Sequence, residues 1–558
     1  MTTYAQLQQA AQASMAATTR VIVQVGHCSQ SVGATQVSEA LRSALSGNTG
    51  VSLIIAGCDG ACFAAPQVLV TNPSGDTQRH TNVSLDDIPA LIEFLIPDNT
   101  AQQQHPPLVK GGSGDLASFF IPQTRLLLSR CGSIDPSSIN EYIAASGYSG
   151  LNTALSQSPE DVIQTVLDAG LLGRGGAYFP AARKWQGARA ANDDPRYLVV
   201  NAEEGEPGLF KDRHIMEGDP HQLLEGALIA AYATGASQTY IYINAEAHLS
   251  AQRIETAIRH AQEVDLIGDD ILGSGFDCQV TVRRGAGGYV CGEETTLLDT
   301  IQGDRREPRL RPPFPVQSGL FQRPTVINNV ETLSNVPMIL SETTVRPEPV
   351  EGPAEDSPVH PPLVKADQGG FSSLGLDSAK GTKLICLSGS VLRPGLAEVP
   401  MGTTLRHVIY DIGGGPPEGA EIGVVAVGGP SSGILPPTEL DMEIRPGMLH
   451  PSGVVMGGGG IMVMPEGIPA IDVVRQLAAY NAAESCGKCT PCREGTPRMV
   501  QILDRISSGN GSNTDLEELR NLAEIVGAAS LCGLGQMSGS PINSALHFFA
   551  DELEKLVN

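Results

Sequence analysis

Four cysteines near the carboxyl end constrain this chain more than any other feature. Cys486, Cys489 and Cys492 are spaced as C-x-x-C-x-x-C in SCGKCTPCREG, and Cys532 follows in SLCGLG. Thiolates at i, i+3 and i+6 around a helix start, with a fourth from a later loop, can each bind a different corner of a cubane. A structural Zn²⁺ is the alternative, but such sites usually pair two separated C-x₂-C units. The spacing therefore favours one [4Fe-4S] cluster.

Composition and charge exclude several classes of protein. The 558 residues are 41% hydrophobic and 17% charged, as in globular chains, and no apolar run approaches the roughly 20 residues that span a bilayer. Lys+Arg 36 against Asp+Glu 61 gives a net charge of −25, which repels nucleic acid and anionic lipid. The segment from Met1 to Gly26 lacks the features of a secretory signal. We expect a cytoplasmic protein that binds no nucleic acid and does not insert into a membrane.

Alternating strand-like and helical segments predict a multidomain α/β protein. Strand-like RYLVVNA, TYIYINA and CQVTVRR alternate with helical LLEGALIAAYATG and AQRIETAIRHAQEV, and helical apolar spacing returns near the carboxyl end. HPPLVK occurs in both of two Pro-rich tracts, which we interpret as linker rather than as an interaction motif. The expected domains are an αβ unit over 1–100, a linker over 101–117, an α/β domain over 118–342, a disordered insertion over 343–370, a β-rich module over 371–464 and a helical domain over 465–558.

A glycine-rich segment, LGRGGAYFPAARKW, precedes a predicted helix. It fails the dinucleotide-binding G-x-G-x-x-G pattern, because Tyr178 stands where the third glycine is needed and the segment upstream is helical. What remains is a loop whose glycines let the backbone approach a phosphate or a flat ring, with Arg174 and Lys184 as counter-charges. An ordinary glycine-rich turn is the alternative.

Two further segments place acidic residues at loop ends. NAEEGEPGLFKDR follows a predicted strand, and RGAGGYVCGEETTLL brings Glu293 and Glu294 to a helix start. Carboxylates in such positions can accept hydrogen bonds from ribose hydroxyls. Alternatively, they only complement the helix dipole.

In their order along the chain, these motifs, together with PPFP and INNVETL, resemble the family of NADH-binding flavoproteins of respiratory complex I. The family includes the diaphorase subunits of NAD-reducing hydrogenases and NAD-dependent formate dehydrogenases. The resemblance implies an α/β FMN- and NADH-binding domain, a ubiquitin-like β-grasp (soluble-ligand-binding) domain and a helical iron–sulfur domain. It also implies a thioredoxin-like module at the amino terminus.

The resemblance implies the reaction and its residues. NADH gives a hydride to FMN, and single electrons leave through the [4Fe-4S] cluster, with no catalytic acid or base from the protein. FMN is expected to contact Gly173, Arg174, Gly175, Lys184, Asn201, Glu203, Gly292, Glu293, Ile327, Asn328, Asn329 and Thr332. NADH is expected to contact Phe179, Glu206, Tyr289, Glu294, Arg311 and Phe314, with the two phenylalanines stacking on the adenine.

The thioredoxin-like module of such relatives holds a [2Fe-2S] cluster on four cysteines. Here only Cys28, Cys58 and Cys62 are present, so we expect a degenerate docking domain rather than an electron relay. The remaining cysteines have no metal spacing and are expected to be buried structural thiols: Cys131, Cys278, Cys291 and Cys386.

The resemblance implies partners as well. These are the iron–sulfur subunits of a larger oxidoreductase, including a [2Fe-2S] thioredoxin-like subunit, in the cytoplasm or on the cytoplasmic side of a membrane complex. The amino-terminal module favours a formate dehydrogenase or hydrogenase diaphorase as the alternative to a complex I subunit. Two further alternatives are a non-catalytic iron–sulfur scaffold and a zinc-stabilised interaction protein.

Overall fold

The computed structural model describes residues 3–15, 18–95, 113–285, 287–342 and 370–557. Most of the predicted linker and all but the last residue of the predicted insertion lie outside these residues. The end of the predicted linker, from Ser113 to 117, is instead the start of helix α5 (Ser113–Phe120). None of the helices within the described ranges is long and apolar enough to cross a membrane.

The amino-terminal unit is a four-stranded sheet covered by helices, in the order β2-β1-β3-β4, with β1 and β2 parallel and the other pairs antiparallel. Val21 and Val23 of β1 are fully buried, and Val37 and Leu41 of α3, one helical turn apart, pack in the same core. The elements of this unit are β1 (Thr19–Gln24), α2 (His27–Gln30), α3 (Ala34–Ala44), β2 (Val51–Ala56), β3 (Val68–Thr71), β4 (Thr77–His80) and α4 (Ile88–Leu95). Helix α1 (Tyr4–Ser14) precedes the unit in sequence and packs on the central domain instead.

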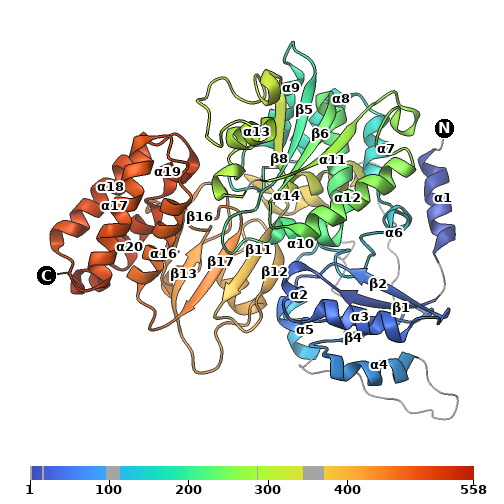
Figure 1. Cartoon of the computed structure of the whole chain (residues 1–558), viewed down its shortest axis with the longest axis horizontal. Coiled ribbons are helices and arrows are strands. Elements are labelled where there is room, and N and C mark those ends of the chain that lie inside the picture. The colour runs from blue at the N-terminus through green and yellow to red at the C-terminus, as the bar shows by residue number, and fades with distance from the viewer. Residues whose placement is uncertain (1–2, 16–17, 96–112, 286, 343–369, 558) are drawn as a thin grey trace.

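The central domain has four parallel strands in the order β7-β6-β5-β8, with helices on both faces (Figure 1). Leu198, Val199 and Val200 of β5 are all fully buried, as expected for a parallel strand covered on both sides. The strands are β5 (Arg196–Ala202), β6 (Ala236–Ile243), β7 (Gln279–Arg284) and β8 (Thr325–Asn329). The helices are α6 (Ile139–Ala144), α7 (Ser149–Leu155), α8 (Pro159–Asp168), α9 (Ala181–Arg189), α10 (Lys211–Gly218), α11 (Pro220–Thr234), α12 (His248–Glu263), α13 (Glu294–Gln302), α14 (Val330–Ser334) and α15 (Val336–Glu342).

A second sheet of five strands follows, in the order β12-β11-β17-β13-β14. A π-helix over His407–Ile412 lies in the same module. The strands after residue 370 are β9 (Gly375–Leu376), β10 (Ala379–Lys380), β11 (Thr382–Gly389), β12 (Gly395–Pro400), β13 (Ile422–Val427), β14 (Gly433–Leu435), β15 (Met448–His450), β16 (Val454–Val455) and β17 (Gly460–Pro465).

The carboxyl-terminal helices form a bundle beside this sheet (Figure 1). Met499, Ile502 and Ile506 of α17 recur at helical spacing and are buried against the neighbouring helices. The helices are α16 (Ala470–Ala483), α17 (Thr490–Ser507), α18 (Asn513–Ala529), α19 (Gly533–Met537), α20 (Ser540–Phe548) and α21 (Ala550–Lys555).

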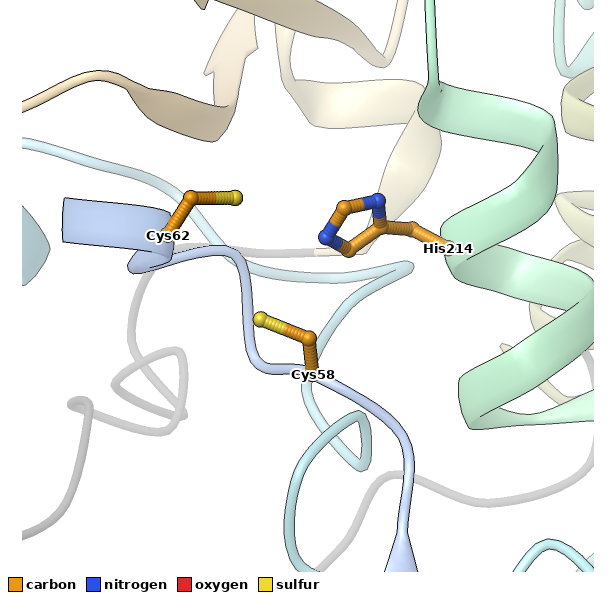
Figure 2. Close-up of side chains that lie close together, drawn as sticks. All are labelled: Cys58, Cys62 and His214. Carbon is orange, nitrogen blue, oxygen red and sulfur yellow. The ribbon is translucent and has the colours of Figure 1, made fainter. Parts of the chain in front are cut away.

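The amino-terminal unit is docked through close backbone contacts as well as long side chains, such as the ion pair of Arg20 with Glu141 at 2.8 Å. A Cβ atom on Gly57 would lie 2.4 Å from Gly218 Cα at the end of α10, so no side chain fits there. Leu396 N of β12 donates a hydrogen bond of 2.9 Å to Gly60 O. The same loop carries Cys58 and Cys62, whose sulfur atoms lie near the ring of His214 on α10 (Figure 2).

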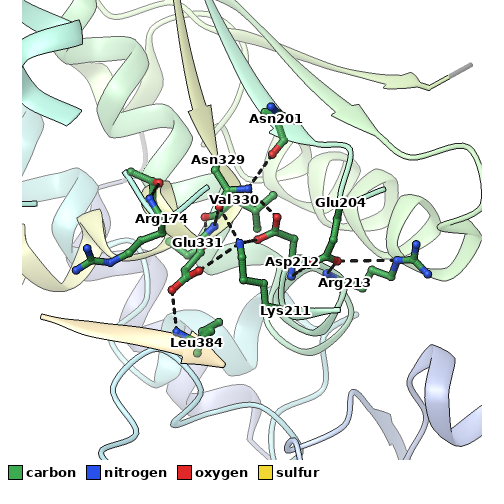
Figure 3. A network of polar contacts seen from close by, with 12 residues as sticks. Arg174, Asn201, Glu204, Lys211, Asp212, Arg213, Asn329, Val330, Glu331 and Leu384 are labelled. Carbon is green, nitrogen blue, oxygen red and sulfur yellow. Dashed lines mark hydrogen bonds and ion pairs between the residues drawn. The ribbon is translucent and has the colours of Figure 1, made fainter. Parts of the chain in front are cut away.

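A buried charge network joins the central domain to the five-stranded sheet (Figure 3). Glu331 of α14 lies between Lys211 Nζ at 3.2 Å and Lys383 Nζ at 2.6 Å, and Leu384 N donates to its other oxygen at 2.9 Å. Burial alone would raise the pKa of Glu331, but the two ammonium groups hold this pKa below its ordinary value. Lys211 also donates to Asn329 Oδ1 at 3.0 Å. One carboxylate therefore fastens three segments that lie far apart in sequence.

We expect Glu331→Gln to destabilise the chain by about 3–5 kcal/mol, because the buried ammonium group of Lys383 loses its counter-charge and that of Lys211 keeps only Asp212. The measurement is the free energy of unfolding in urea. Glu517→Gln, at an exposed position on α18, is the control and should stay within about 0.5 kcal/mol of the unmodified chain. Equal stability of the two variants would contradict this role of Glu331.

Candidate active site

A cavity of 700 Å³ opens where β5 and β8 end beside the glycine-rich loop. The carboxyl ends of neighbouring parallel strands are the usual place for a ligand in an open α/β sheet. Apolar, polar and cationic groups all line this cavity, which we call the large cavity. Its lining is Gly173, Gly175, Ala177, Tyr178, Phe179, Arg183, Lys184, Asn201, Gly292, Glu293, Glu294, Arg311, Phe314, Pro315, Val316, Thr325, Ile327, Asn328, Asn329 and Thr332.

The glycine-rich loop is held tightly against the end of β8. A Cβ atom on Gly175 would lie 3.1 Å from Asn329 Cβ, and Gly176 has a φ of +113°. Tyr178, which stands where a dinucleotide-binding loop needs glycine, has a left-handed φ of +54°. Arg174 N donates to Thr332 Oγ1 at 2.8 Å. These contacts present the loop backbone to the cavity.

Three charged side chains form a cluster on one wall of the large cavity. Glu294 lies between Lys184 Nζ at 3.0 Å and Arg311 Nη1 at 2.6 Å. Burial would raise the pKa of Glu294, but the two cations hold this pKa below its ordinary value. The cluster has one cation in excess, and Arg183, which the sequence analysis did not single out, adds another to the lining. This wall can receive the phosphates of a nucleotide.

Arg174 does not supply the counter-charge that the sequence analysis expected of it. Its guanidinium is fully buried, donates to Lys380 O and lies 5.9 Å from the ring centroid of Phe371. Figure 3 shows the side chain turned away from Asn201 and Asn329. Only the backbone of Arg174 contributes to the loop at the cavity.

A second cavity, of 300 Å³, lies on the other side of a shared wall. This inner cavity contains Glu203, Glu206 and Tyr289 and reaches Cys532. The residues predicted to bind NADH are therefore divided between the two cavities. Glu206 and Tyr289 line the inner cavity, whereas the other four line only the large one: Phe179, Glu294, Arg311 and Phe314. The two cavities share Gly175, Asn201, Gly292, Glu293 and Asn329.

Two carboxyl groups of the inner cavity are held in an uncharged form at neutral pH. Burial raises the pKa of Glu203 to about 8 and that of Glu206 to about 8. Glu203 accepts one hydrogen bond, from Asn244 Nδ2 at 3.2 Å, while its buried Oε2 has no partner. A protonated carboxyl here can donate a hydrogen bond to a ligand.

Glu293 serves the start of a helix, which is the alternative to ribose binding that the sequence analysis gave. Its carboxylate accepts from Thr295 N at 3.0 Å and Thr296 N at 2.9 Å, so it caps α13. The side chain that the sequence singled out as a ligand for ribose is therefore used within the protein, although it still lines both cavities.

The four carboxyl-terminal cysteines gather at the end of the inner cavity. Cys489 is the N-cap of α17, Cys492 lies in its first turn, and Cys532 is the N-cap of α19. Cys489, Cys492 and Cys532 pack with Tyr289 and Leu534. Within the described part of the chain, no three of the four sulfur atoms lie within 4.8 Å of one another. A tetrahedral zinc ion with bonds of about 2.3 Å needs a closer set, so the spread fits a cubane cluster.

The raised pKa of Glu203 predicts how stability varies with pH in the flavin-free chain. Between the ordinary pKa of 4.5 and the folded value of about 8, only the folded state holds this proton, so stability falls as pH rises. We expect Glu203→Gln to reduce this fall, by up to about 1.4 kcal/mol per pH unit. The measurement is the free energy of unfolding in urea at pH 5 and at pH 8. Glu246→Gln, at an exposed position, is the control. An unchanged slope would contradict the assignment.

Comparison with known proteins agrees with this geometry. Residues 166–338 match the Nuo51 FMN-binding domain, 384–435 the SLBB domain and 472–556 the iron–sulfur binding region of NADH-ubiquinone oxidoreductase F. The chain is 44% identical over 436 residues to the NADP-reducing hydrogenase subunit HndC of Solidesulfovibrio fructosivorans, covering 78% of this chain and 84% of the relative.

Two further relatives extend the comparison. The F 2 subunit of NADH-quinone oxidoreductase from Rhizobium meliloti is 41% identical over 415 residues, covering 74% of this chain and 93% of that protein. The crystal structure of an NAD⁺-reducing [NiFe]-hydrogenase in the H₂-reduced state aligns with a TM-score of 0.65 at 28% identity, covering 97% of this chain and 85% of that chain. The chain therefore belongs to the family of NADH-quinone oxidoreductase F subunits, with an FMN-binding domain, an SLBB domain and an iron–sulfur binding region.

Proposed function

We propose that this chain oxidises NADH with FMN and delivers the electrons singly, through a [4Fe-4S] cluster, to an iron–sulfur partner subunit. One observation carries the proposal: the large cavity and the inner cavity share a wall, and the inner cavity ends at Cys532. A ligand in these cavities therefore lies next to the cysteine set. Electrons would pass in this direction, from the ligand to the cluster that these cysteines hold.

The large cavity suits FMN. Gly173 and Gly175 let the loop backbone approach the ligand, and Lys184 places an ammonium group beside it. Asn201 is fixed by donating to Gly292 O at 2.8 Å, and Asn328 accepts from Trp185 Nε1 at 2.9 Å. We assign FMN contacts to Gly173, Gly175, Lys184, Asn201, Glu203, Gly292, Glu293, Ile327, Asn328, Asn329 and Thr332, and to the backbone of Arg174.

NADH binding is supported by two aromatic rings in the lining of the large cavity. Phe179 is 52% exposed and Phe314 is 50% exposed, so both rings are open to a ligand in this cavity. Flat rings of this kind stack on an adenine. Arg311 and Glu294 offer partners for the polar part of the nucleotide, and Glu206 and Tyr289 extend this binding surface into the inner cavity.

The residues around the cavities bind and orient, and none is needed as a catalytic acid or base. When bound, FMN supplies a hydride acceptor that can release electrons one at a time. Glu203, protonated at neutral pH, can donate a hydrogen bond without adding negative charge next to the site. Cys486, Cys489, Cys492 and Cys532 would hold the cluster that receives the electrons.

The parent complex is either a complex I-like NADH:quinone oxidoreductase or a soluble diaphorase. Coverage favours the diaphorase as the second candidate: the hydrogenase structure aligns over 97% of this chain, whereas the Rhizobium meliloti relative aligns over 74%. We assign a thioredoxin-like fold to the amino-terminal unit and a β-grasp fold to the five-stranded sheet. Partners would include a [2Fe-2S] thioredoxin-like subunit, and the complex would lie in the cytoplasm or on the cytoplasmic face of a membrane.

Anaerobic reconstitution with iron, sulfide and FMN tests this function. We expect one FMN per chain, a [4Fe-4S] cluster with about four irons, and oxidation of NADH by an artificial electron acceptor. Parallel assays with NADPH determine the preferred nucleotide. A folded chain that holds its cluster but neither binds FMN nor oxidises either nucleotide would instead be an iron–sulfur scaffold.

We expect Phe314→Ala to raise the KM for NADH about fivefold while leaving FMN content unchanged, because a lost stacking contact costs about 1 kcal/mol. Phe179→Ala should act in the same way. The control is Phe321→Ala, which removes an equally exposed ring that packs on Tyr197 and does not line either cavity. Steady-state kinetics and flavin fluorescence provide the two measurements. A change in FMN content instead of KM would argue against adenine stacking.

A further inference from the structure

The three cysteines of the amino-terminal unit converge at its contact with the central domain. Cys58 is buried, Cys62 is partly buried, and the side chain of Cys62 lies next to those of Cys58 and Cys28. Gly60 N also donates to Cys58 Sγ, at 3.4 Å. Cys28 lies in α2, directly after β1, and the other two cysteines follow β2. From the cysteines alone, one position of a four-ligand metal site is missing.

Helix α10 brings an imidazole to this position. The donor atoms of Cys58, Cys62 and His214 all lie within 4.8 Å of one another. Figure 2 shows the His214 ring with one nitrogen directed toward both sulfur atoms. His214 belongs to the central domain, so no cysteine spacing in the sequence points to it.

The hydrogen bonding of His214 is that of a metal ligand. Its Nδ1 is 2.9 Å from Phe210 O, which fixes the proton on Nδ1 and leaves the Nε2 lone pair free to bind. The residue is 3% exposed, and its buried Nε2 faces the sulfur atoms of Cys58 and Cys62 rather than an oxygen or nitrogen partner. A thiol is only a weak hydrogen-bond partner for this nitrogen. A metal ion in the pocket satisfies it.

We propose that Cys28, Cys58, Cys62 and His214 form one metal centre that joins the amino-terminal unit to the FMN-binding domain. Its ligand set of three thiolates and one imidazole suits either a tetrahedral Zn²⁺ or a [2Fe-2S] cluster, in which each of the two irons would take two of these ligands in addition to the sulfides. The expectation of an incomplete site is thereby revised, because the fourth ligand lies outside the module.

The position of the centre connects it to the flavin site. His214 lies one helical turn after Lys211 and Asp212, which line the inner cavity. In the next turn, Glu217 Oε2 accepts from His27 N at 2.9 Å, beside Cys28. One short helix thus contacts the inner cavity at its start and the cysteine loops further along. The inference does not depend on the proposed NADH oxidation.

Metal analysis of the full chain tests the proposal. Iron and zinc are quantified after anaerobic reconstitution in the unmodified chain, His214→Ala and His248→Ala, the last being an exposed control. Mössbauer and EPR spectra identify the iron species. Beyond the four irons of the carboxyl-terminal cluster, we expect about two further irons or about one zinc per chain. This additional metal should be lost in His214→Ala and kept in His248→Ala.

The conservative variant His214→Cys guards against a folding artefact. It should retain the additional metal, and if that metal is a [2Fe-2S] cluster, its reduction potential should fall as thiolate replaces imidazole. FMN content and NADH oxidation are recorded on the same samples, so failure of the flavin site is distinguished from failure of this centre. The proposal is overturned if the unmodified chain holds no metal beyond four irons, or if His214→Ala keeps the full complement.

Discussion

The buried carboxylate of Glu331 is the interaction on which the arrangement of the domains depends. Two ammonium groups, from Lys211 at the start of α10 and Lys383 in β11, meet it where water is excluded. Such groups are tolerated in a protein interior only when their charges are matched. Lys211 is matched within the flavin domain, by Glu331 and by Asp212 at 2.6 Å, whereas Lys383 of the SLBB domain finds its counter-charge only when the two domains come together. Lys211 also contacts Asn329, at the edge of both cavities. Docking of the SLBB domain is therefore tied to the same network that borders the binding site.

The elements of secondary structure were predictable because local patterns determine them. The parallel strands, the amphipathic helices and the helix start at Cys489 follow from apolar periodicity and motif spacing. The cysteine spacing also predicted the cluster, which the family comparison supports.

The direction of individual side chains was not predictable, because it depends on packing between segments distant in sequence. Arg174 lies in a motif next to the ligand cavity, yet its guanidinium finds a carbonyl and a ring in the segment after residue 370. His214 immediately follows a motif that the sequence analysis used, and only the docking of another domain reveals its neighbours. A sequence gives the order of chemical groups along the chain, while their neighbours in space are set by tertiary contacts.

The contact between Gly57 and Gly218 has a kinetic consequence. Two backbones that touch with no side chain between them leave no soft layer over which the amino-terminal unit could swing. The separation between an electron donor in the flavin cavity and any acceptor held by the cysteine loops is then constant during turnover. Electron transfer across this joint would be governed by driving force and tunnelling distance, and a viscous solvent, which slows domain motion, would leave its rate unchanged.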